Sequence, residues 1–459
     1  MGKLSTFQLI FGGIFVVFIV IGFLYFISSG KKNTAQQKGD YTGSLTIWSI
    51  IPQDLLTAPL EAFTGANPGV RLTYKQINES DITGDLINAL AEGNGPDIIM
   101  FPTDRLIQLR GILYPIAYAN LSQDVFLQKY IDGASILTQP EGVYGLPVLV
   151  DPMVMYVNRD ILTSTFTATV PQYWDEIAAL APGITQKNNA GLITRSAVAL
   201  GFPLNISHVA DIMTALFLQL GNPMVATDDL GEAAGGIQYR TTIRGPGKFS
   251  AHPVEDAFEY TTAFSDSSKP VYSWTSGLPL SRDYFAADRI FVYFGYASEY
   301  GILRTLNPNL NFSIEMLPQM RNSTAKATYA KIYALGLTKK SQNIAAAYAL
   351  ANSISQPEVM QPIYDSLAMP SVFKVSLAKP QTDHRAVVLK QSALISKTWL
   401  NPLPEAYDAA IIQNLQRILS GELLPSQIPN ELDTALAPLF DGVNEQNAEN
   451  AAAAAAAKQ

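Results

Sequence analysis

Residues 45–101 decide the fold class, because three short apolar strands alternate there with two helices. The strands read Leu45-Thr-Ile-Trp-Ser-Ile50, Val70-Arg-Leu-Thr-Tyr-Lys75 and Pro96-Asp-Ile-Ile-Met-Phe101. One amphipathic helix is predicted after the first strand, and a second between a cap at Asp81 or Thr83 and a stop at Gly93. This alternation predicts an α/β fold with a parallel sheet. Ligands of such sheets bind beyond the carboxyl ends of the strands.

Length, composition and charge narrow the class of protein further. The chain has 459 residues, and this length favours two lobes over one small module. Hydrophobic residues make up 48% and charged residues 15%, which argues against a disordered chain. The net charge of −8 argues against a nucleic-acid partner, which would need clustered positive charge.

The residue types present also argue against several kinds of chemistry. The chain contains no cysteine, so disulfides, thiolate nucleophiles and cysteine metal sites are excluded. Its three histidines, His208, His252 and His384, are far apart and show no metal-ligand spacing. We therefore expect no metal and no cofactor.

The first thirty residues have the character of a membrane anchor. No residue from 4 to 30 is charged, and the apolar stretch 7–27 is long enough to cross a hydrocarbon core of about 30 Å. It is longer than the apolar region of a signal peptide, although cleavage near Ser28-Ser29-Gly30 stays an alternative. We predict an uncleaved anchor in 1–30 and a flexible polar stalk in 31–43. The flanking lysines do not decide its orientation.

Further elements are predicted along the rest of the chain. Two apolar runs meet at Asp151-Pro152, and the segment 451–457 is an uninterrupted run of alanine inside a low-complexity tail. The other predictions are a helix over 209–220, a Gly-rich loop over 231–248, strands over 289–294 and 331–337, and a helix from Pro404 to a stop at Gly421.

Five stretches in this order make the chain similar to a known family. They are the opening strand 45–48; 90–99 with Thr103-Asp104-Arg105; 143–148 leading to Asp151 and 156–160; Pro171 with 174–177; and 345–355 near Pro370. Together they resemble the extracellular solute-binding proteins of ABC importers, in the sugar-binding group that includes maltose-binding protein. The resemblance covers roughly 45–439.

The resemblance implies two α/β lobes that are joined by hinge strands and close over a ligand. It places crossings near 148–151, 327–333 and 370–373. The first lobe would comprise 44–150 plus 331–370, and the second 151–330 plus 371–445. Residues 446–459 would form the low-complexity tail.

The resemblance also implies site residues. In the family an acid and an arginine follow the strand that ends here at Phe101, which makes Asp104 and Arg105 candidates for binding sugar hydroxyls. Phe101 stands where a relative has a stacking aromatic, and a place in the core is its alternative. An ion pair in an exposed loop is the alternative for Asp104 and Arg105.

The second lobe supplies four further candidates. Asp151 lies beside the first crossing, with a turn cap as its alternative. Tyr296 follows Gly295 where relatives often carry a stacking Trp, and Trp399 and Tyr407 lie near the position of another aromatic. Flat aromatic rings suit the C–H faces of sugars, while carboxylates, amides and arginine suit their hydroxyls.

These features predict a membrane-anchored extracellular or periplasmic binding protein, not an enzyme. It would capture a sugar or oligosaccharide by closing its lobes and deliver it to an ABC permease. Two alternatives remain. One is a tethered carbohydrate sensor or adhesion protein, and the other is a glycoside-acting enzyme, which would need a pair of carboxyl groups close together.

Overall fold

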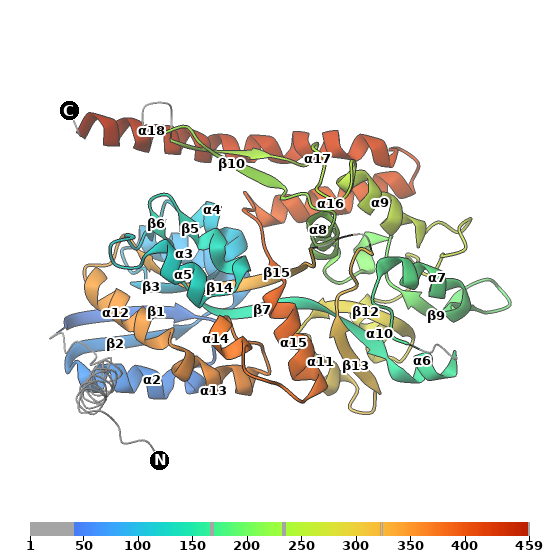
Figure 1. Ribbon diagram of the computed structural model, residues 1–459, viewed down its shortest axis with the longest axis horizontal. Helices are drawn as coiled ribbons and strands as arrows, with labels where there is room; N and C mark the ends of the chain where they lie inside the picture. Colours follow the sequence, from blue (N-terminus) through green and yellow to red (C-terminus); the bar gives the residue numbers. More distant parts are fainter. Residues whose placement is uncertain (1–40, 166–168, 232–235, 322, 324, 458–459) are drawn as a thin grey trace, which may run out of the picture.

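The computed structural model describes residues 41–165, 169–231, 236–321, 323 and 325–457, which form two lobes side by side (Figure 1). The expected anchor in 1–30, and the expected stalk as far as residue 40, lie outside the described residues. Within the described part of the chain, no helix combines the length and the apolar character needed to cross a membrane.

Three parallel strands organise the first lobe. Its elements are β1 (Thr42–Ser49), α2 (Gln53–Ala66), β2 (Gly69–Gln76), α3 (Ile82–Ala91), β3 (Ile98–Pro102), α4 (Leu106–Leu109), β4 (Leu113–Tyr114), α5 (Gln123–Lys129), β5 (Thr138–Gln139), β6 (Gly142–Val143), α12 (Ile344–Ile354), α13 (Pro357–Leu367) and α14 (Lys374–Leu377). β1 lies between β2 and β3 and is parallel to both, with Leu45 opposite Leu72 and Ile47 opposite Ile98. The predicted parallel α/β sheet is confirmed.

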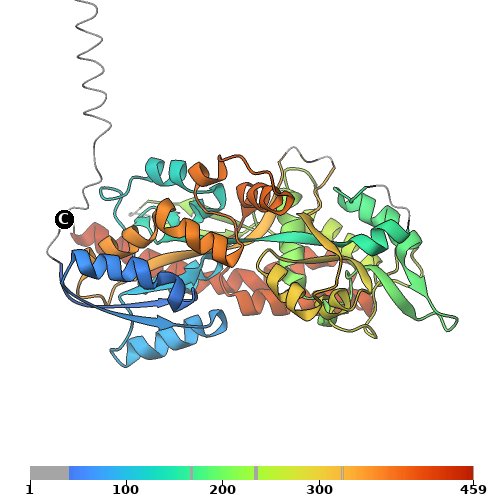
Figure 2. The ribbon, with the colours of Figure 1, turned by 90° about the horizontal axis from the view of Figure 1, so that it is seen from below.

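Two long strands connect the lobes, β7 (Leu146–Asn158) and β14 (Thr328–Thr338), with the short β15 (Ser396–Lys397) beside β14. β7 is buried along its whole length and passes from one lobe into the other (Figure 2). The two apolar runs predicted on either side of Asp151-Pro152 thus form one strand. Pro152 has no N–H to donate to the sheet. Its carbonyl oxygen accepts a hydrogen bond from the backbone N–H of Ala297 at 3.0 Å, so this position of the strand still makes a backbone hydrogen bond.

The second lobe continues the same sheet. Its elements are α6 (Arg159–Ser164), α7 (Trp174–Ile184), β8 (Gln186–Lys187), β9 (Ile193–Val198), α8 (Val209–Gln219), α9 (Pro253–Ala263), α10 (Ser281–Ala286), β12 (Ile290–Tyr296), α11 (Glu299–Leu306), β13 (Phe312–Met316), α15 (His384–Leu394), α16 (Pro404–Leu419) and α17 (Ile428–Leu436). The sheet runs in the order β2-β1-β3-β14-β7-β12-β9-β8. The predicted helix from Pro404 is confirmed, and Gly421 follows it with a φ of +78°, a conformation that glycine adopts readily.

One prediction, the loop over 231–248, is wrong in part. Residues Ile237–Thr241 form β11, which pairs antiparallel with β10 (Val225–Asp229). Burial explains the strand, because Ile237 and Tyr239 pack with Phe440 and with Ile107 of α4 in a small third core. The hairpin therefore connects the second lobe to the first.

The C-terminal tail is helical and ordered against this hairpin. The last helix, α18 (Asp441–Ala457), runs along the hairpin and over the first lobe (Figure 1). The Asn444 side chain bonds both backbone groups of Tyr239, at 2.8 and 2.9 Å, and the Asn447 amide donates to the Ile237 carbonyl at 2.8 Å. These contacts hold the asparagine-rich start of the tail in place, although its composition indicates no packed structure.

The hydrophobic cores show where the chain changes lobe. The buried hydrophobic residues form one core in each lobe, called here the first and the second core. The first core contains Val150 and Ala330, whereas the second contains Met153 and Tyr329, so both long strands pass from one lobe to the other at this point. The expected third crossing near 370–373 lies too early, because Phe373 still packs in the first core, where its ring is 5.3 Å from that of Tyr130. The chain changes core along α15 instead. We keep the proposed division of the chain into two lobes, with the third crossing moved from 370–373 to α15.

Candidate ligand-binding site

The candidate site is a cavity of about 390 Å³ between the lobes, beside the hinge strands. Both lobes contribute to its wall. The first lobe supplies the loop after β1, the turn before α3 and the end of α13, and the second supplies β12 and α11. The charged and hydroxyl-bearing residues of the lining are Glu79, Asp151, His208, Arg282, Tyr296, Ser298, Glu299, Lys331 and Tyr333.

Asp104 and Arg105 lie at the carboxyl end of β3, as the sequence predicts, in a short turn of helix over Thr103–Arg105. One carboxylate oxygen of Asp104, Oδ1, is buried and has no hydrogen-bond partner among the described residues. Burial raises the pKa of Asp104 to about 6, against the opposing effect of Lys331 and Arg105. This oxygen is a free acceptor, but Asp104 is not among the residues that line the cavity.

Arg105 connects the two lobes directly. Its Nη2 lies 2.5 Å from Glu405 Oε1 on α16, and its Nη1 donates to Gln108 Oε1 at 3.2 Å. The guanidinium of Arg105 is therefore bound by other side chains of the protein. An ion pair was the alternative role predicted for this residue. The partner, however, lies across the cleft and not in the same loop.

Phe101 lies in the first core, fully buried, and presents no face to the cavity. Its ring fills the space left by two glycines, since a Cβ built on Gly336 would lie 2.8 Å from Phe101 Cε1 and one on Gly145 would lie 3.2 Å from it. The structure therefore gives the stacking role of Phe101 no support.

Trp399 and Tyr407 also lie in a core and not at the cavity. Both are buried in the second core, with ring centroids 4.9 Å apart in an edge-to-face arrangement. The Tyr407 hydroxyl is 2.6 Å from Thr214 Oγ1. Both side chains therefore pack inside the core, as buried aromatic residues typically do.

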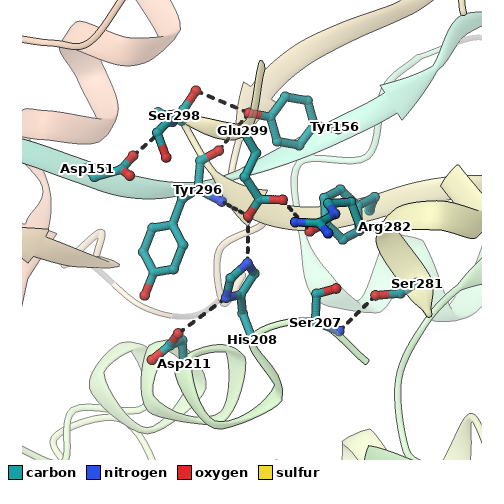
Figure 3. Close-up of polar contacts among 12 residues, drawn as sticks. Asp151, Tyr156, Ser207, His208, Asp211, Ser281, Arg282, Tyr296, Ser298 and Glu299 are labelled. Atoms are coloured by element: carbon teal, nitrogen blue, oxygen red, sulfur yellow. Dashed lines mark hydrogen bonds and ion pairs between the residues drawn. The ribbon is translucent and has the colours of Figure 1, made fainter. Parts of the chain in front are cut away.

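Asp151 lies on the hinge, opposite Lys331 in the register of β7 and β14. The backbone N–H of Ser298 donates to Asp151 Oδ1 at 3.0 Å, just before α11 begins (Figure 3). Burial raises the pKa of Asp151 to about 6, and the Ser298 hydrogen bond opposes this shift. Asp151 thus accepts a hydrogen bond from the backbone just before a helix, as a capping residue does. Its side chain also lines the cavity.

Lys331 and Glu79 form a pair that sequence reasoning missed. Lys331 Nζ is 2.7 Å from Glu79 Oε1, and the Tyr333 hydroxyl donates to Glu79 Oε2 at 2.6 Å. Burial favours the neutral amine, but Glu79 and the nearby Asp211 and Asp104 raise the pKa of Lys331 on balance. A single lysine inside the otherwise apolar strand 331–337 was the one signal available.

A second missed group surrounds His208, which precedes α8 with a left-handed φ of 59°. His208 Nε2 is 2.6 Å from Glu299 Oε1, and Glu299 also accepts from the Tyr293 hydroxyl at 2.6 Å and from the Tyr296 backbone N–H at 3.1 Å (Figure 3). Burial opposes both charges, yet the contact with Glu299 leaves the pKa of His208 raised. The same contact leaves the pKa of Glu299 lowered.

Tyr296 lies at the cavity, as predicted, and is 3% exposed. Its ring meets the His208 ring edge to face, with centroids 4.9 Å apart. Its hydroxyl is buried beside the Asp211 carboxylate, and burial together with that carboxylate raises the pKa of Tyr296 well above the usual value.

The cavity wall offers a ligand several carboxylate acceptors, a few donors and the aromatic rings of Tyr296 and Tyr333. The described residues contain no group of three or more His, Asp and Glu that could hold a metal ion. Carboxylates and an aromatic ring at a hinge suit the binding of a small polar solute by the surfaces of both lobes.

Comparison with known proteins agrees with this geometry. The family model described as bacterial extracellular solute-binding protein matches residues 58–387. A protein of Brucella abortus (strain 2308) described as a binding protein is 28% identical over 128 residues, which cover 27% of this chain and 30% of that protein. The match to this curated relative thus spans less than a third of its length.

Solved structures share the fold over most of the chain. The cyclic α-maltosyl-1,6-maltose binding protein of Arthrobacter globiformis is 15% identical, with a TM-score of 0.69 over 88% of this chain and 100% of that one. The sugar-binding protein MalE of Xanthomonas citri is 18% identical, with a TM-score of 0.67 over 87% and 98%. The predicted resemblance is confirmed: the chain belongs to the bacterial extracellular solute-binding protein family.

Proposed function

We propose that the protein captures a sugar or oligosaccharide outside the cell by closing its two lobes, and delivers it unchanged to an ABC permease. The observation that carries the proposal is the cavity at the hinge, to which both lobes contribute charged side chains. A ligand that contacts both lobes binds the closed form more tightly than the open form, and it therefore stabilises the closed form.

The class of ligand is proposed from two sources. Structural neighbours are sugar-binding proteins, among them a cyclo/maltodextrin-binding protein solved with maltotetraose. The cavity wall also carries the carboxylates of Asp151 and Glu299 together with the aromatic ring of Tyr296. Hydroxyl groups donate well to such oxygens, and the apolar face of a sugar packs on an aromatic ring.

We further propose that residues 1–30 anchor the protein in the membrane with the lobes on the outer side, joined by the stalk in 31–43. The uncharged stretch 4–30 supports the anchor. Tethering raises the local concentration of the binder near a membrane permease.

A thermal-shift screen of the purified full chain against mono- and oligosaccharides tests the proposal. A ligand present at a hundred times its Kd stabilises the folded form by about 2.7 kcal/mol, which is readily measured as a rise in Tm. Asp151→Asn should reduce the rise, whereas Asp124→Asn, at an exposed position of α5 with no contact to the cavity, should leave it unchanged. The absence of any rise with every sugar would contradict the proposal.

A further inference from the structure

Most of the charged side chains that line the cavity are already paired with one another. Lys331 Nζ lies 2.7 Å from Glu79 Oε1, and the hydroxyl of Tyr333 donates to the second oxygen of Glu79 at 2.6 Å. His208 Nε2 lies 2.6 Å from Glu299 Oε1. With His208 protonated, each of these two pairs adds no net charge to the cavity, and each carboxylate is bound by donors of the protein.

Arg282 is different, because the protein gives it no close acidic partner. It lines the cavity from α10 of the second lobe, and its side chain is 35% exposed (Figure 3). Its one ion contact among the described residues is with the adjacent Asp283, whose Oδ1 lies 3.8 Å from Arg282 Nε, beyond hydrogen-bond distance.

The Nε atom of Arg282 gives a second sign that a partner is missing. It is buried, and it has no hydrogen-bond partner in the part of the chain that the structure describes. Buried polar atoms in native proteins are nearly always hydrogen-bonded. We therefore expect this guanidinium to bind a group that comes from outside the protein.

Asp151 is the remaining charged residue among those described that line the cavity. In Figure 3 it lies on the opposite side of Glu299 from Arg282. It accepts a hydrogen bond from the backbone N–H of Ser298 at 3.0 Å. A carboxylate has several acceptor positions, so Asp151 can also accept hydrogen bonds from the hydroxyls of a ligand. The cavity thus offers a hydroxyl acceptor on one side and a cation without an acidic partner on the other.

A guanidinium in this position favours a ligand with a carboxylate. Its N–H groups form a planar fork that matches the two oxygens of a carboxylate, whereas a neutral hydroxyl would leave its charge unbalanced. Three carboxylates, those of Glu79, Asp151 and Glu299, already line the cavity. A group with a single negative charge therefore fits better than a doubly charged phosphate, which these carboxylates would repel more strongly.

We propose that the solute captured in this cleft is an acidic sugar, a uronic acid or a short oligouronide, whose carboxylate binds Arg282. Its hydroxyls would face Asp151, and its ring would pack beside Tyr296. This inference rests on the proposed function, since it names the class of sugar for the same cavity.

Matched sugars test the charge of the ligand. Galacturonic acid, glucuronic acid and their short oligomers are compared with their methyl esters and with neutral sugars of the same length, by thermal shift and calorimetry on the full chain. Succinate serves as a carboxylate that is not a sugar. We expect the uronates to bind at least about tenfold more tightly than either neutral series, and their affinity to fall as salt rises.

The outcomes separate this inference from the proposed function. Neutral sugars or methyl esters that bind as tightly as the uronates would overturn the inference and leave sugar capture standing. Binding of succinate without binding of any sugar would overturn both the acidic sugar and the proposed function. If no member of the panel binds, both fail.

Variants of Arg282 provide the second measurement. Arg282→Gln removes the charge, so it should weaken binding of a uronate at least about tenfold while changing the affinity for the neutral sugar less than about threefold. Arg282→Lys keeps the charge without the planar fork, and its affinity should lie between the two. Arg289→Gln, at an exposed position just before β12 and outside the cavity lining, should leave binding unchanged.

The same variants show whether Arg282 has a structural role instead. The Tm of the free protein should be nearly the same for wild type and Arg282→Lys. An equal loss of affinity for the uronate and the neutral sugar in both Arg282 variants, with a lower Tm, would show that Arg282 supports the fold and would overturn the proposal.

Discussion

Replacing His208 by asparagine tests the buried network at the hinge. Asparagine tolerates the left-handed backbone that His208 adopts, so His208→Asn removes the ion pair without adding backbone strain. Glu299, which is 4% exposed, loses the contact at 2.6 Å but keeps its hydrogen bonds to Tyr293 and Tyr296.

The cost follows from these contacts. A hydrogen bond to a charged group contributes about 1.5–3 kcal/mol, and the partial exposure of His208 places this contact at the lower end, about 1.5 kcal/mol. For a chain of 459 residues that corresponds to a fall in Tm of about 1–2 °C.

The effect must also depend on pH. Since folding raises the pKa of His208 above 6.5, its contribution is fully present below pH 6.5 and is lost as the pH rises through the folded value. Glu299 has the opposite sign, because its lowered pKa makes its contribution present above pH 4.5. The difference in Tm between wild type and His208→Asn should therefore be largest near pH 5.5–6.5 and smaller at pH 9. Equal differences at both pH values would refute the assignment of this pair.

Three further changes have defined outcomes. Tyr407→Phe removes the hydroxyl contact with Thr214 inside the second core; calorimetry should show a loss of about 1 kcal/mol in stability and unchanged sugar affinity. Gly336→Ala brings a methyl group within 2.8 Å of Phe101, and denaturant unfolding should show a loss of about 1–3 kcal/mol; full stability would mean that the first core is looser than described. Tyr239→Phe removes the hydroxyl that links the β10–β11 hairpin to the first lobe, so proteolysis should release α18 sooner than in the wild type.

Much of the fold follows from local patterns. The alternation of 45–101 predicts the parallel strands because strand and helix periods differ, and the order of weak motifs indicates the family. The hairpin at Ile237–Thr241 could not be predicted, because its burial depends on Phe440, about 200 positions away in the chain.

The site was less accessible to sequence reasoning. Asp151 and Tyr296 were predicted and do lie at the cavity, but Phe101, Trp399 and Tyr407 lie in the cores. An aromatic side chain suits a core and a sugar face equally well, so position in the sequence does not separate the two roles. The pairs of Lys331 with Glu79 and of His208 with Glu299 join residues 252 and 91 positions apart, and neither lies in a local motif.

The most direct test of lobe closure is a distance between spin labels across the cleft. The chain contains no cysteine, so labels can be placed at Thr57→Cys on α2 and Thr305→Cys on α11, both exposed and on different lobes. Adding the sugar that raises Tm most should shift the distribution of distances to shorter values and narrow it. Saturated binding with an unchanged distribution would contradict capture by closure.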